Sequence, residues 1–386
     1  MVTAAHQPHQ IDEIFAGTLL EPRAYQRRVT AKVVDWFGGK FKDRTGILKP
    51  AANSVLVESP TGSGKTSMGL VIAKALQDEY GIKVGWFAMR RELLAQARRE
   101  NVEKGINVNA HFVSMFDRNP PTDLDLLITD EAQHDAANTM AHLHSVIKPR
   151  WALGLTATPF RTDRVKLCYD VVIKDAGIKQ LMMDGFLSKY HHYTIPRWDV
   201  ETVAETYLRE PERWGKTVVF FQRKELCHAF IQLLRAGGVP SDVVTGESDR
   251  EFQLAAFNSG EYRVLANCMV LTEGFDCPDL QTVFIRDSSK GPTIQMGGRV
   301  LRKFPGVHFK QIVQSEKTHW PFLRTALPDR QFLRVGDEWR SLQLNPKIEL
   351  INTNTRLAIA QVEVKIPDFI VQKAGKVKKL RFPRQS

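Results

Sequence analysis

The stretch Ser59-Pro60-Thr61-Gly62-Ser63-Gly64-Lys65-Thr66 decides the fold because of what lies on either side of it. The apolar run Val55-Leu56-Val57 before it is typical of a buried strand, and the pattern from Thr66 onward is helical. A strand, a glycine-rich turn and a helix start direct backbone N–H groups and the positive end of a helix at one point. The stretch therefore predicts a phosphate-binding loop.

The residues of this loop have separate expected roles. The stretch matches G-x-x-x-x-G-K-S/T, except that Ser59 stands where the first glycine belongs. The pattern predicts that Lys65 reaches the β and γ phosphates of a nucleotide and that the Thr66 hydroxyl holds Mg²⁺. The rest of the nucleotide site is expected from Thr61, Gly62, Ser63 and Gly64. Glycine-rich turns also close ordinary strand-helix units, so the loop alone leaves a structural role open.

Bulk composition limits the classes of protein to consider. A chain of 386 residues that is 43% hydrophobic and 25% charged predicts a globular protein of two domains, with or without an appendage. No apolar run is long enough to span a bilayer, and residues 1–20 lack the features of a secretory signal, so we expect a cytoplasmic protein without a membrane partner. The four scattered cysteines indicate buried, reduced thiols, with neither a disulfide framework nor a structural zinc site.

The charge balance favours a polyanionic partner. Lys and Arg number 54 against 43 Asp and Glu, which gives a net charge of +11. The final 22 residues, from Lys365, contain seven basic side chains and one acid, Asp368. Such a tail is either a solvated chain end or a nucleic-acid contact, and a basic surface kept for solubility is also open.

The order of apolar runs predicts an α/β protein built from two tandem parallel-sheet domains. Strands are expected near 55–57, 83–89, 124–129, 151–155, 218–221, 242–245, 263–268 and 282–286, and helices near 29–37, 68–76, 91–103, 225–236, 250–257 and 293–303. We expect a loosely held arm at 1–20, a first domain at 21–190, a second at 191–315 and a basic C-terminal extension at 316–386. Residues 185–215, with Pro196 and Pro211, read as the crossover between the halves. In the extension, residues 319–326 suggest a helix and residues 348–366 alternate as β-formers.

Asp130 and Glu131 supply the acidic partner that a phosphate loop needs. They follow the apolar run at 124–129, so they lie at the end of a strand in the same half as the loop. An aspartate there can hold Mg²⁺, and the adjacent glutamate can orient and deprotonate an attacking water. Two acids at a strand end can also serve as a helix cap, but their place between the loop and Thr156-Ala157-Thr158 favours the catalytic interpretation.

Over residues 21 to 305 the chain resembles the superfamily 2 helicases, which consist of two RecA-like domains. The motifs that carry the resemblance occur in the family's order. They are Arg23-Ala24-Tyr25-Gln26, Ser59 to Thr66, Arg90-Arg91-Glu92-Leu93, Asp130-Glu131-Ala132-Gln133, Thr156-Ala157-Thr158, Phe220-Phe221-Gln222, Thr272-Glu273-Gly274-Phe275-Asp276 and Gln295 to Arg302.

The resemblance implies a role for each matching position. Gln26, with Arg23, would contact adenine, because an amide can pair with the N6 and N7 edge of that base. Arg299 and Arg302, expected on one face of a helix, would reach the γ-phosphate from the second domain. Further roles are ribose contact for Gly274 and Asp276, coupling of hydrolysis to movement for Gln133, Thr156, Thr158 and Gln295, and nucleic-acid contact for Arg90, Arg91, Gln222, Arg223 and Thr272.

Gln133 departs from the family pattern, in which Asp or His is usual. Its amide can still form hydrogen bonds toward the second domain, so we expect ATPase activity to survive. The departure excludes the DEAD-box and DEAH groups. Gly185-Phe186-Leu187 and the stretch from Arg299 to Pro305 resemble the DNA-repair and restriction branch, with its RadD-like and type III restriction subunits, and the compact chain is similar to small phage-encoded helicases.

The resemblance implies a monomeric, ATP- and Mg²⁺-dependent DNA helicase or translocase that acts in repair, recombination or replication. Three alternatives stay open. An RNA helicase would share every motif, and a translocase would move on duplex or branched DNA without opening it. A nucleic-acid-binding module with an inactive ATP site would bind without hydrolysis, although the intact Lys65, Asp130 and Arg299 argue against it.

Overall fold

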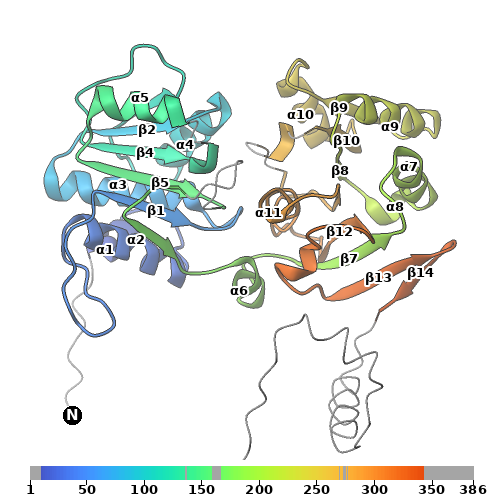
Figure 1. Ribbon diagram of the computed structural model, residues 1–386, viewed down its shortest axis with the longest axis horizontal. Coiled ribbons are helices and arrows are strands. Elements are labelled where there is room, and N and C mark those ends of the chain that lie inside the picture. Colours follow the sequence, from blue (N-terminus) through green and yellow to red (C-terminus); the bar gives the residue numbers. More distant parts are fainter. Residues whose placement is uncertain are drawn as a thin grey trace, which may run out of the picture. The chain divides into compact units, whose positions relative to one another are not determined.

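The computed structural model of the protein describes residues 10–134, 137–158, 167–268, 270–272, 275 and 277–342. Residues 1–341 form one unit and residues 342–386 the other, of which only Leu342 is described. The first unit contains two sheets with helices on their faces, which confirms the predicted α/β class (Figure 1). Within the described part of the chain, no helix has both the length and the apolarity needed to cross a membrane.

The first lobe is built on a six-stranded parallel sheet in the order β3-β2-β4-β5-β1-β6. Its strands are β1 (Ser54–Glu58), β2 (Val84–Ala88), β3 (Ala110–Ser114), β4 (Leu126–Asp130), β5 (Trp151–Thr156) and β6 (Val171–Lys174). Its helices are α1 (Gln10–Ala16), α2 (Ala24–Phe37), α3 (Lys65–Tyr80), α4 (Arg91–Glu103), the short 3-10 turn η1 (Ala132–His134) and α5 (Ala137–Ile147), and α6 (Ile178–Met183) follows β6.

Alternation along the strands determines which helices cover each face of this sheet. Trp86 of β2 belongs to the buried cluster that includes α1 to α4, whereas its neighbour Phe87 packs with Met140 and Leu143 of α5. A strand that is apolar on both sides is what a parallel sheet covered on both faces requires. Because all five residues of β4 are buried as well, Asp130 ends the strand in a dry environment.

The second lobe has an eight-stranded sheet in the order β14-β13-β7-β12-β11-β8-β10-β9, parallel except for the β13–β14 pair. Its strands are β7 (Lys189–Ile195), β8 (Thr217–Phe220), β9 (Ser241–Val244), β10 (Val264–Asn267), β11 (Thr282–Ile285), β12 (Phe309–Ser315), β13 (Arg330–Val335) and β14 (Glu338–Ser341). Its helices are α7 (Val200–Arg209), α8 (Pro211–Trp214), α9 (Lys224–Ala236), α10 (Arg250–Ser259) and α11 (Lys290–Gly298), with 3-10 turns η2 (Val270–Thr272) and η3 (Phe322–Arg324). Helices α7 and α9 pack on one face, α10 and α11 on the other.

Residues 10–20 differ from the loosely held arm that we expected. They contain α1, whose Ile11 and Phe15 are 1% and 3% exposed in the first core. Gln10 Nε2 donates to the Ala75 carbonyl of α3, and Arg27 pairs with Asp12. A seven-residue helix is too short to show a clear period in the sequence, and it depends on tertiary packing for its stability.

The expected crossover at 185–215 was also wrong, because this region contains β7, α7 and α8. Pro196 directly follows β7, and Pro211 is the first residue of α8, where a missing N–H costs nothing. At the C-terminal side, residues 316–341 of the expected extension hold η3, β13 and β14, so a helix over 319–326 is reduced to one 3-10 turn. Residues 348–366 and the basic tail lie outside the described residues.

The cysteines fit the expectation of buried thiols only in part. Cys227 and Cys277 are buried, Cys268 is partly buried and Cys168 is exposed, and all four are free. Burial raises the pKa of the Cys227 thiol to about 12, so this side chain is a protonated core residue.

Candidate nucleotide and nucleic-acid site

The phosphate loop lies between β1 and α3, as the sequence predicted. Gly62 and Gly64 both have a φ of 79°, a backbone conformation that favours glycine. Ser59, at the first glycine position, donates its hydroxyl to Ser63 Oγ at 2.7 Å, and both side chains are buried. The departure from the usual pattern therefore adds a hydrogen bond across the base of the loop.

Helix α2 is hydrogen-bonded to the phosphate loop. Tyr25 Oη and Gln26 Nε2 both donate to the Ser63 carbonyl, at 2.5 and 2.9 Å. Gln26 Oε1 accepts from the Arg23 backbone N–H at 2.8 Å, which caps the helix. Tyr25 has no role in our sequence analysis, although it lies within the quoted Arg23-to-Gln26 motif. The adenine contact of Gln26 stays a prediction.

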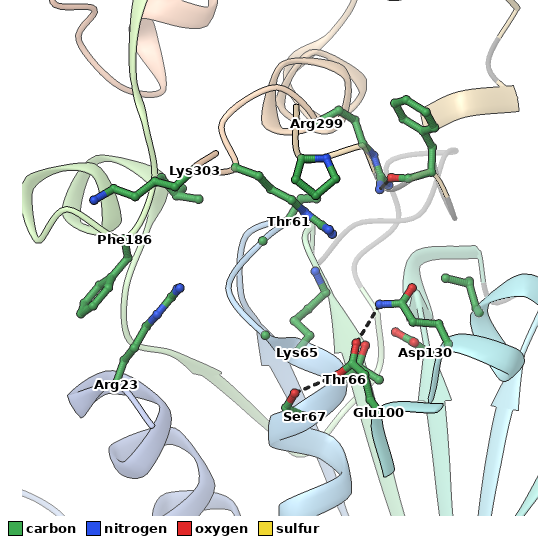
Figure 2. A pocket seen from close by; sticks show the side chains of 18 of the residues that line it. Arg23, Thr61, Lys65, Thr66, Ser67, Glu100, Asp130, Phe186, Arg299 and Lys303 are labelled. Atoms are coloured by element: carbon green, nitrogen blue, oxygen red, sulfur yellow. Dashed lines mark hydrogen bonds between the residues drawn. The ribbon is translucent and has the colours of Figure 1, made fainter. Parts of the chain in front are cut away.

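A cavity of about 590 Å³ opens above the loop and is lined from both lobes. Its polar and charged lining includes Arg23, Thr61, Lys65, Thr66, Ser67, Gln96, Glu100, Lys104, Asp130, Glu131, Arg299, Arg302 and Lys303. In Figure 2, Lys65 and Asp130 enter from the first lobe while Arg299 comes from the end of α11. The structure thus brings the five predicted catalytic residues to one cavity, while their catalytic roles stay predictions.

Lys65 and Asp130 carry opposite charges in a buried setting. Burial lowers the pKa of Lys65; the carboxylates of Glu131 and Asp130 oppose this shift, whereas Arg299 and Arg302 add to it. Burial and the Glu131 carboxylate raise the pKa of Asp130 to about 7, and Lys65 opposes the rise. Charged groups in a cleft whose pKa values are shifted by burial and by neighbouring charges are candidates for a functional site.

Arg299 and Arg302 reach the cavity from a turn. Helix α11 ends at Gly298, so the expected placement of the two arginines on one helical face was wrong. Arg299 is 8% exposed and its Nη1 donates to the Phe275 carbonyl at 3.0 Å. Arg302 lies against the loop itself, because a Cβ added to Gly62 would be 3.4 Å from Arg302 Cγ. Two arginines of one lobe therefore face the phosphate loop of the other.

Thr66 and Asp130 fit the requirements of a Mg²⁺ site. Both line the cavity beside Lys65, and Asp130 has one carboxylate oxygen accepting the Glu131 N–H at 3.0 Å. Mg²⁺ retains several waters and needs only one or two protein oxygens alongside substrate phosphates. Among the described residues, no cluster of three or more His, Cys, Asp or Glu side chains suited to a metal occurs.

A chain of hydrogen bonds connects the acidic motif with the threonine motif. Gln133 Nε2 donates to Glu131 Oε2 at 2.9 Å, and Gln133 Oε1 accepts from Thr156 Oγ1 at 2.5 Å. Thr156 Oγ1 also accepts the Thr158 N–H at 3.0 Å. These two bonds of Gln133 lie within the first lobe, and the expected hydrogen bond toward the second lobe stays a prediction. Glu131 adopts a φ of 53°, an uncommon backbone conformation for this residue type and one typical of functional positions.

The second lobe meets this chain at α11. The Thr158 methyl group lies 3.9 Å from where a Cβ would stand on Gly291, and Thr61 Cβ of the loop lies 3.6 Å from where a Cβ would stand on Gly298. Gln295 is partly buried on the same helix. Thr158 and the helix that carries Gln295 therefore lie at the contact between the lobes, and the coupling function of the predicted residues stays a prediction.

Four of the five predicted nucleic-acid residues lie at the N-terminal ends of helices. Arg90 and Arg91 begin α4, and the exposed Gln222 and Arg223 precede α9. Arg90 Nη1 donates to the Val270 carbonyl of η2, the turn that also contains Thr272. Gly274 and Asp276, predicted to contact the ribose, lie outside the described residues.

A second cavity of about 170 Å³ adjoins the loop on the side of α1 and α2. Phe15, Leu20, Arg23, Gln26 and Met68 contribute to its walls. Phe186 lies nearby, since the Arg23 guanidinium stands 4.5 Å from its ring centre (Figure 2). Sequence reasoning missed Phe15 and Leu20 because we treated residues 1–20 as an arm, and it noted Phe186 only within a family-like tripeptide.

Comparisons with known proteins agree with this architecture. The family described as type III restriction enzyme, res subunit, matches residues 19–114, and the helicase conserved C-terminal domain matches residues 199–304. These two matches imply the use of ATP.

Similar proteins come from phage and yeast. A "51.5 kDa protein" of a Lactococcus phage is 25% identical over 261 residues, which cover 58% of this chain and 57% of the relative. The Saccharomyces cerevisiae protein IRC3, which is named as a proposed ATP-dependent helicase, is 26% identical over 220 residues, which cover 46% of this chain and 32% of the relative. The chain thus spans less than two thirds of the length of these relatives.

Solved structures share the fold. The DNA-bound type ISP restriction-modification enzyme LlaBIII matches 76% of this chain and 27% of its own, with 17% identity and a TM-score of 0.52. A variant of S. cerevisiae Dbp5 bound to RNA and ADP BeF3 matches 90% of this chain and 97% of its own, with 13% identity and a TM-score of 0.60. At such identities the likeness concerns the fold alone, and it confirms the pair of RecA-like domains.

The ordered motifs, the two family matches and the shared cavity together show that the chain is similar to the superfamily 2 helicases, a class of ATP-using enzymes. Within that superfamily, the match of residues 19–114 to the res subunit makes the chain similar to the type III restriction-like branch.

Proposed function

We propose that this protein is an ATP-dependent DNA translocase or helicase. One observation carries the proposal: Lys65, Asp130 and Glu131 of the first lobe share a cavity with Arg299 and Arg302 of the second. A nucleotide bound there would contact both lobes, so its hydrolysis would change how the lobes are held together. That is the requirement for a motor, whereas a storage or structural nucleotide site needs only one lobe.

Each residue of the cavity would have its own role in ATP hydrolysis. Lys65 and the loop N–H groups bind the phosphates, and Arg299 and Arg302 stabilise the charge that develops on the transferred phosphoryl group. Glu131 orients a water molecule and accepts its proton, and Gln133 holds that carboxylate in place. Mg²⁺, when bound by Thr66 and Asp130, would neutralise charge on the β and γ phosphates. Asp130 would be ionised at physiological pH when it holds such a cation, despite its burial.

DNA is the proposed partner. The res-subunit match and the fold of a DNA-bound restriction enzyme support it, as does the net charge of +11. Arg91 and Arg223 are exposed at the N-terminal ends of α4 and α9, one on each lobe. Contacts of this kind go mainly to phosphates, so we expect strong salt dependence and little sequence preference. The likeness to RNA-bound Dbp5 supports RNA as the alternative partner.

The test is an ATPase assay with single-stranded, duplex, forked and four-way DNA and with RNA in parallel. We expect stimulation by DNA, and loss of hydrolysis in Lys65→Ala with its circular dichroism unchanged. Stronger stimulation by RNA would favour the alternative partner. Normal hydrolysis by Lys65→Ala would refute the site. A strand-separation assay on the fork then distinguishes a helicase from a translocase, and a repair, recombination or replication role is proposed only as the setting for either.

A further inference from the structure

Lys310 is a fully buried lysine that the proposed mechanism does not use. It lies on β12, and 0% of its surface is exposed. Strand β12 pairs with β7 on one side, where Tyr190 is the register partner of Lys310, and with β11 on the other. Its ammonium group donates to two backbone carbonyls, those of Pro278 at 2.8 Å and Leu280 at 2.5 Å. A buried charge needs such partners, because an unpaired ammonium in a core is strongly destabilising.

Those two carbonyls belong to residues 277–280, which are described and lie close in sequence to Phe275 of the cavity wall. Phe275 and Pro278 line the cavity, and Phe275 is 3% exposed. The Phe275 carbonyl accepts the hydrogen bond from Arg299 Nη1 at 3.0 Å. The loop that Lys310 holds is thus the loop that holds Arg299.

We propose that Lys310 is a positioning residue for ATP hydrolysis: by binding the Pro278 and Leu280 carbonyls it fixes the loop that aims Arg299 at the phosphate site. The inference rests on the proposed function. It adds a requirement that no motif contains, since the charge of a residue outside the cavity decides whether an arginine inside it is correctly placed. Positioning errors of about 1 Å are enough to lower a rate by roughly a hundredfold.

The charges around Lys310 make this role sensitive to pH. Burial lowers the pKa of Lys310 to about 8, and Cys277 and Asp279 on the loop oppose that shift. Asp279 pairs with Lys216 at 2.5 Å, Cys277 Sγ lies 3.0 Å from Asp279 Oδ1, and Tyr190 on β7 donates its hydroxyl to Ala326. Above pH 8 a neutral Lys310 would hold the two carbonyls less strongly, so kcat should fall there.

The sign of the stability effect is opposite to that of the rate effect. The folded-state pKa of about 8 lies below the unfolded value of about 10.4, so between them the unfolded chain binds more protons. The contribution of Lys310 to stability therefore rises with pH across this window while kcat falls. A merely structural role for Lys310 predicts no such fall in kcat.

Lys310→Met and its matched control Lys216→Met test the proposal. Lys216 also contacts the loop, through Asp279, but not the Pro278 or Leu280 carbonyl. At saturating ATP and DNA we expect Lys310→Met to lower kcat by on the order of tenfold or more, with KM for ATP and DNA affinity within about twofold of wild type, and to lose the alkaline decline. Lys216→Met should keep both the rate and the decline.

A second readout is the affinity for ADP with beryllium or aluminium fluoride, measured in Lys310→Met, Arg299→Ala and the double variant. If Lys310 acts through Arg299, the two losses will not add. Additive losses, equal effects of the two lysine variants, or a wild-type kcat that is flat from about pH 7 to about pH 9.5 would each overturn the proposal. The pH profile needs only the wild-type protein, so the test stands even if Lys310→Met does not fold. A wild type without ATPase activity would instead refute the proposed function.

Discussion

Ser59 illustrates how one unexpected side chain can be fitted into a common loop. Its hydroxyl satisfies the buried Ser63 hydroxyl, so Ser59→Ala should lower the free energy of unfolding by about 1–2 kcal/mol and weaken ATP binding. The Ser59→Ala/Ser63→Ala double variant is the control, because removing both partners leaves no buried hydroxyl unsatisfied. Chemical denaturation should rank the double variant nearer to wild type, and equal stability of Ser59→Ala and wild type would contradict this account.

Residues with a motif of their own could be predicted from the sequence, and residues that act through backbone groups could not. Lys65, Asp130 and Arg299 stand at fixed offsets within recognisable patterns, and the structure brings them to one cavity. Tyr25 and Lys310 act on carbonyl oxygens far along the chain, at Ser63 and at Pro278 and Leu280. No side-chain pattern records which carbonyl a folded loop will present, so these contacts required the structure.

Helix α1 is the element whose importance the sequence concealed. Phe15 is buried in the first core and lines the smaller cavity beside Arg23 and Gln26. Phe15→Ala should therefore lower the free energy of unfolding by about 3–5 kcal/mol, measured by denaturant titration, and weaken ATP binding. Phe15→Leu, which keeps most of the volume, is the control and should be less affected in both respects. A Phe15→Ala protein as stable as wild type would return residues 10–20 to the status of a loose arm.

The end of α11 depends on a glycine that contacts an aromatic ring. A Cβ on Gly297 would stand 2.3 Å from Phe322 Cε2, whereas a Cβ on Gly291 of the same helix would find its nearest neighbour at 3.9 Å. Gly297→Ala should therefore displace η3 or the helix end, lowering the melting temperature and the ATPase rate together, while Gly291→Ala should keep both. Equal melting temperatures for the two variants would show that the ring moves aside at little cost.

Helices and strands with a regular apolar pattern or a glycine that ends them were predicted well. Those that depend on partners far along the chain were not. Helix α4 and strands β2, β4 and β5 lie where their apolar patterns put them. Helix α11 was placed too far along the chain because Val300 and Leu301 continue an apolar pattern, although Gly297 and Gly298 end the helix. Strand β7 was missed because the prolines near it suggested a loop, and it is stabilised by parallel pairing with β12, more than one hundred residues later.

At the scale of the whole molecule, the lobes contribute unequal halves of one site. The first lobe supplies the loop, the acids and the smaller cavity, and the second supplies Arg299 and Arg302. The buried Lys65 and Asp130 come from one lobe, and the two arginines that line the same cavity come from the other. If a nucleotide binds there as we propose, occupancy of the site would depend on the approach of the lobes, and a small chemical change could then become a movement of domains.

Positive charge is concentrated at the C-terminal end of the chain. More than half of the net charge of +11 comes from the final 22 residues, which lie outside the described part of the chain. If these side chains bind phosphates, removing residues 366–386 should weaken DNA binding. The slope of log affinity against log salt should then fall by roughly 0.7 for each phosphate of a single strand that is no longer neutralised. The ATPase rate at saturating DNA should not change, because both lobes and the cavity remain.

A variant with the Lys and Arg of residues 366–386 replaced by Gln is the control for length in this experiment. It keeps the full chain and removes only the positive charges, so it should reproduce both the weaker binding and the smaller salt slope of the truncation. Because the binding of phosphates is an effect of charge, a Gln variant that binds like wild type would contradict the electrostatic account even if the truncation weakens binding. Unchanged affinity and slope in both variants would identify the tail as a solvated chain end and leave DNA binding to the helix N-termini of the two lobes.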